Sequence, residues 1–122
     1  MPFCLCRVTV DVTHEQEKTL SSRIGQALGH GERFLLLDVQ ANCHMILRGS
    51  ATEDVAYIQL SIFGNEEHCG YAQLTQKITG IVYEVLGIPT ENIYIQYVDI
   101  PCFGWAGSTF PASCDATNSG TP

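Results

Sequence analysis

The strongest constraint on the fold of this chain is an internal repeat in which a strand, a helix and a second strand occur twice. Each half contains an apolar stripe with helical spacing that ends in Leu-Gly, at Leu28-Gly29 and again at Leu86-Gly87. Apolar residues three, four, seven and eight positions apart share one face of a helix. The stripes consist of Leu20, Ile24, Ala27 and Leu28, and of Leu74, Ile78, Ile81, Val82 and Val85. The repeat therefore predicts two amphipathic helices in two β-α-β units.

The ends of both helices carry recognisable signals. Thr13 and Gln16 have the spacing of a capping box, so the first helix should begin directly after Thr13. Gly29 should end it, because glycine readily adopts the left-handed conformation that follows many helices. Gly87 should end the second helix, and Pro89 prevents its continuation.

Four apolar segments rich in β-branched residues predict the strands. They are Phe3 to Val12, Phe34 to Val39, Val55 to Phe63 and Ile93 to Ile100. With right-handed crossovers, two β-α-β repeats give a mixed four-stranded sheet with both helices on one face. We therefore expect an α+β fold over a domain of residues 1–110. A shorter segment, Met45 to Leu47, is a candidate for a small edge strand.

The second face of such a sheet has no covering element within one chain. Phe3 and Leu5 are apolar, and so are Cys4 and Cys6, which alternate with them along the first strand. Because both faces of the strand are apolar, the uncovered face needs a partner. Self-association into a closed homo-oligomer is the economical way to cover it.

The charge of the chain excludes several classes of partner. The net charge is −7, with 13 Asp and Glu against 6 Lys and Arg. An acidic chain without a basic run is a poor ligand for nucleic acids and for anionic membrane surfaces. Its apolar segments are too short to span a bilayer. The amino terminus lacks the layout of a secretory signal, which predicts synthesis in the cytoplasm and reduced cysteines.

Two further features need an interpretation. Cys4 and Cys6 lie on one face of the first strand, where they could contribute to a metal site or be two small buried thiols. We favour buried thiols, because free cysteine is often buried, and we expect no metal. After Phe110 the chain consists mainly of Pro, Ala, Ser, Thr, Asn and Gly without a periodic apolar face. Residues 111–122 are therefore predicted to be a disordered tail.

Four segments, taken in order, carry a family resemblance: Met1-Pro2 leading directly into a strand, Gly49-Ser50 after a short apolar segment, Leu86 to Tyr97, and Gly104 to Phe110. Together they resemble the macrophage migration inhibitory factor and D-dopachrome tautomerase family over residues 1–110. The resemblance implies a homotrimer with active sites between neighbouring subunits. It also implies tautomerisation of phenylpyruvate-like enols and dopachrome esters without a cofactor, and thus a small aromatic keto or enol substrate.

The resemblance makes Pro2 the expected catalytic residue. Tautomerisation moves a proton between a carbon next to a carbonyl and the carbonyl oxygen, which needs a base with a pKa near the working pH. The secondary amine of an N-terminal proline can be that base, and burial in an apolar pocket lowers the pKa of an amine. Met1 must be removed, because the proline nitrogen of the unprocessed chain is a non-basic amide.

The resemblance also implies the substrate-binding residues. Tyr94 and Gln96 match a substrate-contacting tyrosine and asparagine of the family, and Phe34 replaces a frequent tyrosine. The apolar lining corresponds to Phe63, Phe103, Trp105 and Phe110. The alternative for these aromatic residues is ordinary core packing. That alternative explains Trp105, in its glycine-flanked segment, least well.

One segment departs from the family pattern. The exit of the first helix usually carries Gly-Lys-Pro, whose lysine assists binding of the substrate carboxylate. Here the segment reads Gly29-His30-Gly31-Glu32-Arg33, and a neutral histidine supplies no charge at pH 7. Arg33 could compensate, unless it pairs with Glu32. The alternative is that His30 is a solvated loop residue outside the site.

Three functions are consistent with these features. The leading one is an isomerase of the phenylpyruvate tautomerase or L-dopachrome isomerase type. The second is a cytokine-like ligand, exported without a signal peptide and bound by a cell-surface receptor, with weak or vestigial activity. The third is a trimeric scaffold with neither role. The acidic charge, the missing lysine and the added tail are the features that favour the second.

Overall fold

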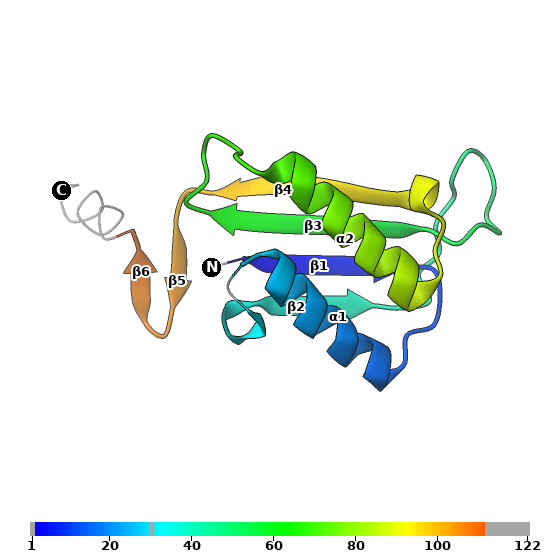
Figure 1. Cartoon of the computed structure of the whole chain (residues 1–122), viewed down its shortest axis with the longest axis horizontal. Helices are drawn as coiled ribbons and strands as arrows, with labels where there is room; N and C mark the ends of the chain where they lie inside the picture. The colour runs from blue at the N-terminus through cyan, green and yellow to red at the C-terminus, as the bar shows by residue number, and fades with distance from the viewer. Residues whose placement is uncertain (1, 30, 112–122) are drawn as a thin grey trace.

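The described part of the chain, residues 2–29 and 31–111 of a computed structural model, contains one α+β domain (Figure 1). The residues of the expected tail beyond 111 lie outside it. Three segments form the first repeat and three form the second, each with a short 3₁₀ turn before its last strand. The elements are β1 Phe3–Val8, α1 His14–Ala27, η1 Glu32–Phe34, β2 Leu36–Gln40, β3 Ala56–Phe63, α2 Tyr71–Leu86, η2 Thr90–Asn92, β4 Ile93–Ile100, β5 Phe103–Trp105 and β6 Ser108–Phe110.

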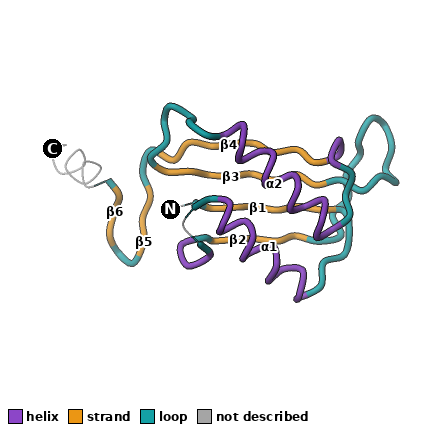
Figure 2. Tube along the Cα trace, viewed as in Figure 1, coloured by secondary structure: helices purple, strands orange, loops and turns teal. Residues whose placement is uncertain are grey.

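The four long strands form a mixed sheet in the order β2-β1-β3-β4. Each repeat contributes a parallel pair, β1 with β2 and β3 with β4, and the two repeats join through the antiparallel pair β1 and β3. Both helices lie on the same face of this sheet (Figures 1 and 2). The fold predicted from the repeat is confirmed.

The helix signals in the sequence are also confirmed. The hydroxyl of Thr13 accepts a hydrogen bond from the backbone N–H of Gln16 at 3.1 Å, and the Gln16 side chain accepts one from the Thr13 N–H at 2.9 Å. The residue Gly87 ends α2 with φ of 73°, the left-handed conformation that favours glycine.

The core lies between the sheet and the two helices. Its fully buried side chains come from one face of the sheet and from both helical stripes: Cys4, Cys6, Val8, Ile58 and Leu60 from the strands, and Leu20, Ile24, Ile78 and Val82 from the helices. No helix in the described residues is long and apolar enough to cross a membrane.

The thiols of Cys4 and Cys6 belong to this core. Burial raises the pKa of Cys4 to about 12 and that of Cys6 to about 11, with neighbouring thiols acting in the same direction. Both therefore stay protonated at neutral pH in this core. Cys43 and Cys69 are also free thiols. Cys102 is disulfide-bonded, so the expectation of reduced cysteines is wrong for this residue.

Several element boundaries differ from the predicted ones. The strand β1 ends at Val8 instead of Val12, because its antiparallel partner β3 begins only at Ala56. Phe34 belongs to the 3₁₀ turn η1, in which the Leu35 N–H donates to the Glu32 carbonyl at 3.2 Å. The expected edge strand at Met45 to Leu47 is reduced to a single bridge between Leu47 and Ser50.

The hairpin of β5 and β6 was not predicted from the sequence. It forms a separate two-stranded sheet in which Phe103 pairs with Phe110. In Figure 2 the hairpin stands beyond the end of the main sheet where β1 begins and where β3 and β4 end. It therefore brings aromatic side chains from the end of the domain close to its beginning.

Candidate active site

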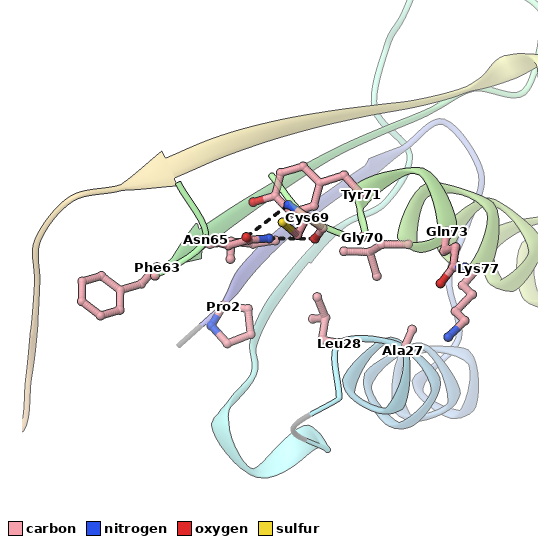
Figure 3. A pocket seen from close by; sticks show the side chains of 13 residues that line it. Pro2, Ala27, Leu28, Phe63, Asn65, Cys69, Gly70, Tyr71, Gln73 and Lys77 are labelled. Carbon is pink, nitrogen blue, oxygen red and sulfur yellow. Dashed lines mark hydrogen bonds between the residues drawn. The ribbon is translucent and has the colours of Figure 1, made fainter. Parts of the chain in front are cut away.

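A cavity of about 360 Å³ opens between the two helices and the sheet, next to the start of β1. The floor is formed by Pro2 and the end of β3, and one wall by Ala27 and Leu28 at the end of α1. The loop of residues 64–70 and the first turns of α2 form the opposite wall (Figure 3). A cavity of this size, largely preformed, is typical of a site for a small molecule.

Pro2 is buried and held by the neighbouring strands. Its carbonyl oxygen accepts a hydrogen bond from the Leu36 N–H at 3.4 Å. The next residue, Phe3, is paired with Leu36 on β2 and with Ser61 on β3. Because β1 is a central strand, the proline ring has a fixed position at the cavity.

The loop wall of the cavity is tied together by Asn65. Its side-chain amide donates to the Cys69 carbonyl at 2.9 Å and accepts from the Cys69 N–H at 3.2 Å (Figure 3). The His68 ring nitrogen Nε2 lies 2.8 Å from the Asp99 carboxylate on β4. The wall is thus anchored both internally and to the edge of the sheet.

Tyr71 is the first residue of α2, and it packs between His68 of this loop and Tyr97 of β4. Its ring stacks on Tyr97 with centroids 4.2 Å apart, and on the His68 ring at 5.4 Å. Burial raises the pKa of the Tyr71 hydroxyl, and the charge of Asp99 acts in the same direction. The hydroxyl oxygen is buried, and the nearby Asn65 side chain acts on its pKa in the opposite direction. Tyr71 therefore stays neutral at any ordinary pH.

An aromatic cluster continues from the cavity toward the hairpin. Phe63, which lines the cavity, meets Phe103 edge to face with centroids 4.9 Å apart. Phe103 in turn contacts Phe3 at 6.2 Å and stacks on Phe110 at 5.2 Å. The structure thus brings three of the four predicted lining residues into one cluster, of which Phe63 lines the Pro2 cavity.

Trp105 and Phe34 lie elsewhere in the isolated chain. Trp105 is at the end of β5, and 54% of its surface is exposed. Phe34 is 43% exposed and lies under the guanidinium of Arg33, 5.3 Å from its ring centroid. Neither lines the cavity of its own chain. His30 lies outside the described residues, so its position relative to the cavity is not described.

Tyr94 and Gln96 are not part of this cavity either. Tyr94 pairs with Tyr57 near the start of β3, whereas Phe3 pairs with Ser61 near its end. Four residues of strand separate the two positions by about 13 Å. The side-chain oxygen Oε1 of Gln96 accepts a hydrogen bond from the Tyr57 hydroxyl. Neither Tyr94 nor Gln96 lines the cavity within one chain.

The cavity residues with polar or thiol side chains were not among the predicted site residues: Asn65, Cys69, Tyr71, Gln73 and Lys77. Four of them are polar or thiol residues on a loop and on the solvent side of a helix, where such residues are common. The one usable signal is spacing, because Gln73 and Lys77 are four residues apart on one face of α2.

The comparisons with known proteins identify the family of the chain. The macrophage migration inhibitory factor (MIF) family matches residues 1–111 of the chain. The chain belongs to this family. The resemblance seen in the sequence is thereby confirmed, and it extends through the β5–β6 hairpin. No curated protein gave a significant match.

Solved MIF structures share the fold. MIF2 of Leishmania major is 26% identical, with a TM-score of 0.82 over 90% of this chain and 97% of its own. The MIF homologue of Prochlorococcus marinus is 25% identical, with a TM-score of 0.76 over 88% of this chain and 98% of its own. MIF of Trichinella spiralis is 20% identical, with a TM-score of 0.78 over 88% of this chain and 99% of its own.

Proposed function

We propose that the chain is a cofactor-independent keto–enol tautomerase in which Pro2, freed by removal of Met1, is the general base. The observation that carries the proposal is the burial of Pro2 at the floor of a preformed cavity. Once Met1 is removed, the Pro2 nitrogen is a secondary amine at this cavity, and burial disfavours the protonated form of an amine. Membership of the MIF family supports the same reaction.

The reaction needs only proton transfers, which this site could perform with its own residues. The Pro2 nitrogen takes a proton from the carbon next to the substrate carbonyl, and the C–H electron pair becomes the enol double bond. The enolate oxygen then receives the proton from the Pro2 ammonium, directly or through water, so that Pro2 is neutral again and atoms and charge balance without an external reactant. The substrate we propose is a small aromatic keto or enol compound such as phenylpyruvate, whose ring would pack against Phe63 and Phe103.

The complete site in this proposal is shared between subunits of a homotrimer. Tyr94 is 48% exposed and Leu36 is 63% exposed, both on the face of the sheet that the helices leave uncovered. A neighbouring subunit that covers this face could place its own Tyr94 and Gln96 at the cavity. The same neighbouring subunit could also cover the exposed side chain of Trp105.

A signalling role is the second candidate, because the family takes its name from an effect on macrophages. In that case the chain would leave the cell without a signal peptide and bind a receptor, with weak or vestigial catalysis. Detection of the processed protein in the medium of intact producing cells would support this role. It would not replace the enzymatic one unless the cavity were also inactive.

The test is turnover by the purified chain and by its Pro2→Gly variant. Glycine keeps a free amine at the same position but loses the ring that fixes its geometry. We expect phenylpyruvate enol–keto conversion by the wild type and a loss of about 100-fold or more in kcat/KM for the variant. Equal rates for the two proteins, with Met1 absent from both, would show that Pro2 is not the base.

A further inference from the structure

The loop of residues 64–70, which forms one wall of the Pro2 cavity, is closed on itself by hydrogen bonds. The backbone carbonyl of Asn65 accepts a hydrogen bond from the His68 N–H at 3.1 Å. The Asn65 side chain accepts one from the Cys69 N–H at 3.2 Å and donates one to the Cys69 carbonyl at 2.9 Å (Figure 3). Because Asn65 is bonded to two residues across the turn, the loop should move as one body instead of unravelling.

Two glycines connect this body to the rest of the chain. Gly64 follows β3 and has φ of 86°, and Gly70 precedes α2 and has φ of 80°. A Cβ at either position would meet nothing within 4 Å, so the surroundings leave both backbones room to turn. Glycine adopts positive and negative φ about equally readily, and hinges are a few residues at the ends of a moving segment that absorb the change in φ and ψ. Gly64 and Gly70 are therefore suitable hinge positions.

The attachments of the loop to its surroundings are made by side chains. Among the described residues, no backbone hydrogen bond joins residues 65–69 to another segment. Its polar attachment to the sheet is the His68 imidazole, whose Nε2 lies 2.8 and 3.0 Å from the two oxygens of the Asp99 carboxylate on β4. On the side of α2, the His68 ring stacks on Tyr71, and the Asn65 side chain acts on the Tyr71 hydroxyl. The loop can therefore leave its place without disrupting a strand or a helix.

We propose that residues 64–70 form a hinged lid of the Pro2 cavity, with Gly64 and Gly70 as its hinges and the His68–Asp99 pair as its latch. The lid provides one wall of the cavity, and the end of α1 provides the opposite wall (Figure 3). When the lid turns outward, the space beside Pro2 opens for a ligand to enter, and when the latch forms, the wall is complete. The inference rests on the proposed function only for the identity of the ligand, because the motion belongs to the chain without ligand.

The motion is tested by ¹⁵N relaxation dispersion NMR on the unliganded full chain, which detects exchange on the microsecond to millisecond timescale of lid opening. We expect the amides of residues 65–69 to exchange between two states at one shared rate, since the lid moves as one body. The amides of β1 and β3 should show no such exchange. Separate rates at each residue of the loop, or no exchange in residues 65–69, would overturn the proposal.

The latch is tested with Asp99→Ala and a matched control, Asp11→Ala. Each variant removes one exposed carboxylate that is hydrogen-bonded to one side chain, since Asp11 accepts a hydrogen bond from Asn42 at 3.1 Å beyond the far end of β1. Because solvent screens a half-exposed pair, the ratio of open to closed lid should rise only about two- to fivefold in Asp99→Ala. It should stay constant in Asp11→Ala. The same ratio in Asp99→Ala and the wild type would show that the pair is not the latch.

Loop exchange and turnover distinguish this inference from the proposed function. Shared exchange of residues 65–69 that responds to Asp99→Ala, in a protein that never converts phenylpyruvate, would support the lid and refute the tautomerase proposal. Turnover that Pro2→Gly abolishes, in a protein whose loop shows no exchange, would refute the lid and leave the tautomerase proposal intact. In a protein that shows both, saturating phenylpyruvate should lower the open fraction, because a ligand in the cavity contacts the closed wall. An unchanged open fraction at saturation would show that the loop does not close over the substrate.

Discussion

The imidazole Nε2 of His68 lies 2.8 Å from the Asp99 carboxylate, so a loop that walls the Pro2 cavity is pinned to the last strand of the main sheet. Because both side chains are about half exposed, solvent screens the pair and its contribution to global stability is small. Its effect should instead be local. The pair holds the wall, and Tyr71 stacks on the same histidine.

Removal of this anchor should affect the cavity more than the fold. We expect His68→Ala to lower kcat/KM for phenylpyruvate by up to about fivefold, the equivalent of an exposed ion pair worth as much as 1 kcal/mol. The melting temperature should change by only a few degrees. His14→Ala is the matched control, because His14 faces Glu17 on the exposed side of α1. A loss of activity equal in both variants would contradict a local role for the His68–Asp99 pair.

Alanine substitutions at two helical glycines should have opposite effects on stability. A Cβ added at Gly25 would lie 2.6 Å from the Glu32 backbone nitrogen, whereas a Cβ at Gly80 meets nothing within 4 Å. Gly25→Ala should therefore push the segment after α1 away from the helix and destabilise the protein by about 1–3 kcal/mol, as overpacking does. Gly80→Ala should stabilise it by about 0.5–1 kcal/mol through helix propensity. Urea denaturation of both variants measures the difference, and the same sign for both would contradict the close approach at Gly25.

The buried thiol of Cys6 predicts a dependence of stability on alkaline pH. Burial, with Cys43 acting in the same direction, raises its pKa from 9.0 to about 11. The unfolded thiol ionises first, so the contribution of Cys6 to stability is complete below about pH 9 and is lost as the pH rises toward 11. In Cys6→Ala the free energy of unfolding should fall less steeply over this interval than in the wild type. An equally steep fall in both proteins would contradict this role of the Cys6 thiol.

Trp105 offers a direct probe of self-association, because it is the single tryptophan of the chain. Its side chain is 54% exposed in one subunit. If a neighbouring subunit covers it, tryptophan emission should shift to longer wavelength as the protein is diluted below its dissociation constant. Sedimentation on the same samples should show a trimer at micromolar concentration. A soluble monomer with constant emission at all concentrations would contradict both the trimer and the shared site.

The parts of the fold that could be predicted are those that depend on residues close together in the sequence. Three such features are the apolar stripe from Leu74 to Val85, the capping box at Thr13 and the helix end at Gly87. Each depends on neighbours within two helical turns. The β5–β6 hairpin was missed because its strands have three residues each, too few to show alternation around Gly104 and Gly107.

The site was less predictable because it depends on long-range register. Pro2 and Phe63 lie together because β1 and β3 are antiparallel, and the same register keeps Tyr94 about 13 Å along the sheet. Lys77 gave no signal in the sequence, since exposed lysines on helices are common. Only the packing of α2 beside α1 makes its position at the cavity meaningful.

The most direct test of the account is the activity of the chain with and without Met1. Intact mass would first establish which form is present, and protein that retains Met1 would then be compared with processed protein of the same fold and oligomeric state. The account predicts phenylpyruvate tautomerisation by the processed form and almost none by the form with Met1, because an amide nitrogen at Pro2 cannot accept the proton. Equal turnover by both forms would contradict the assignment of Pro2 as the base.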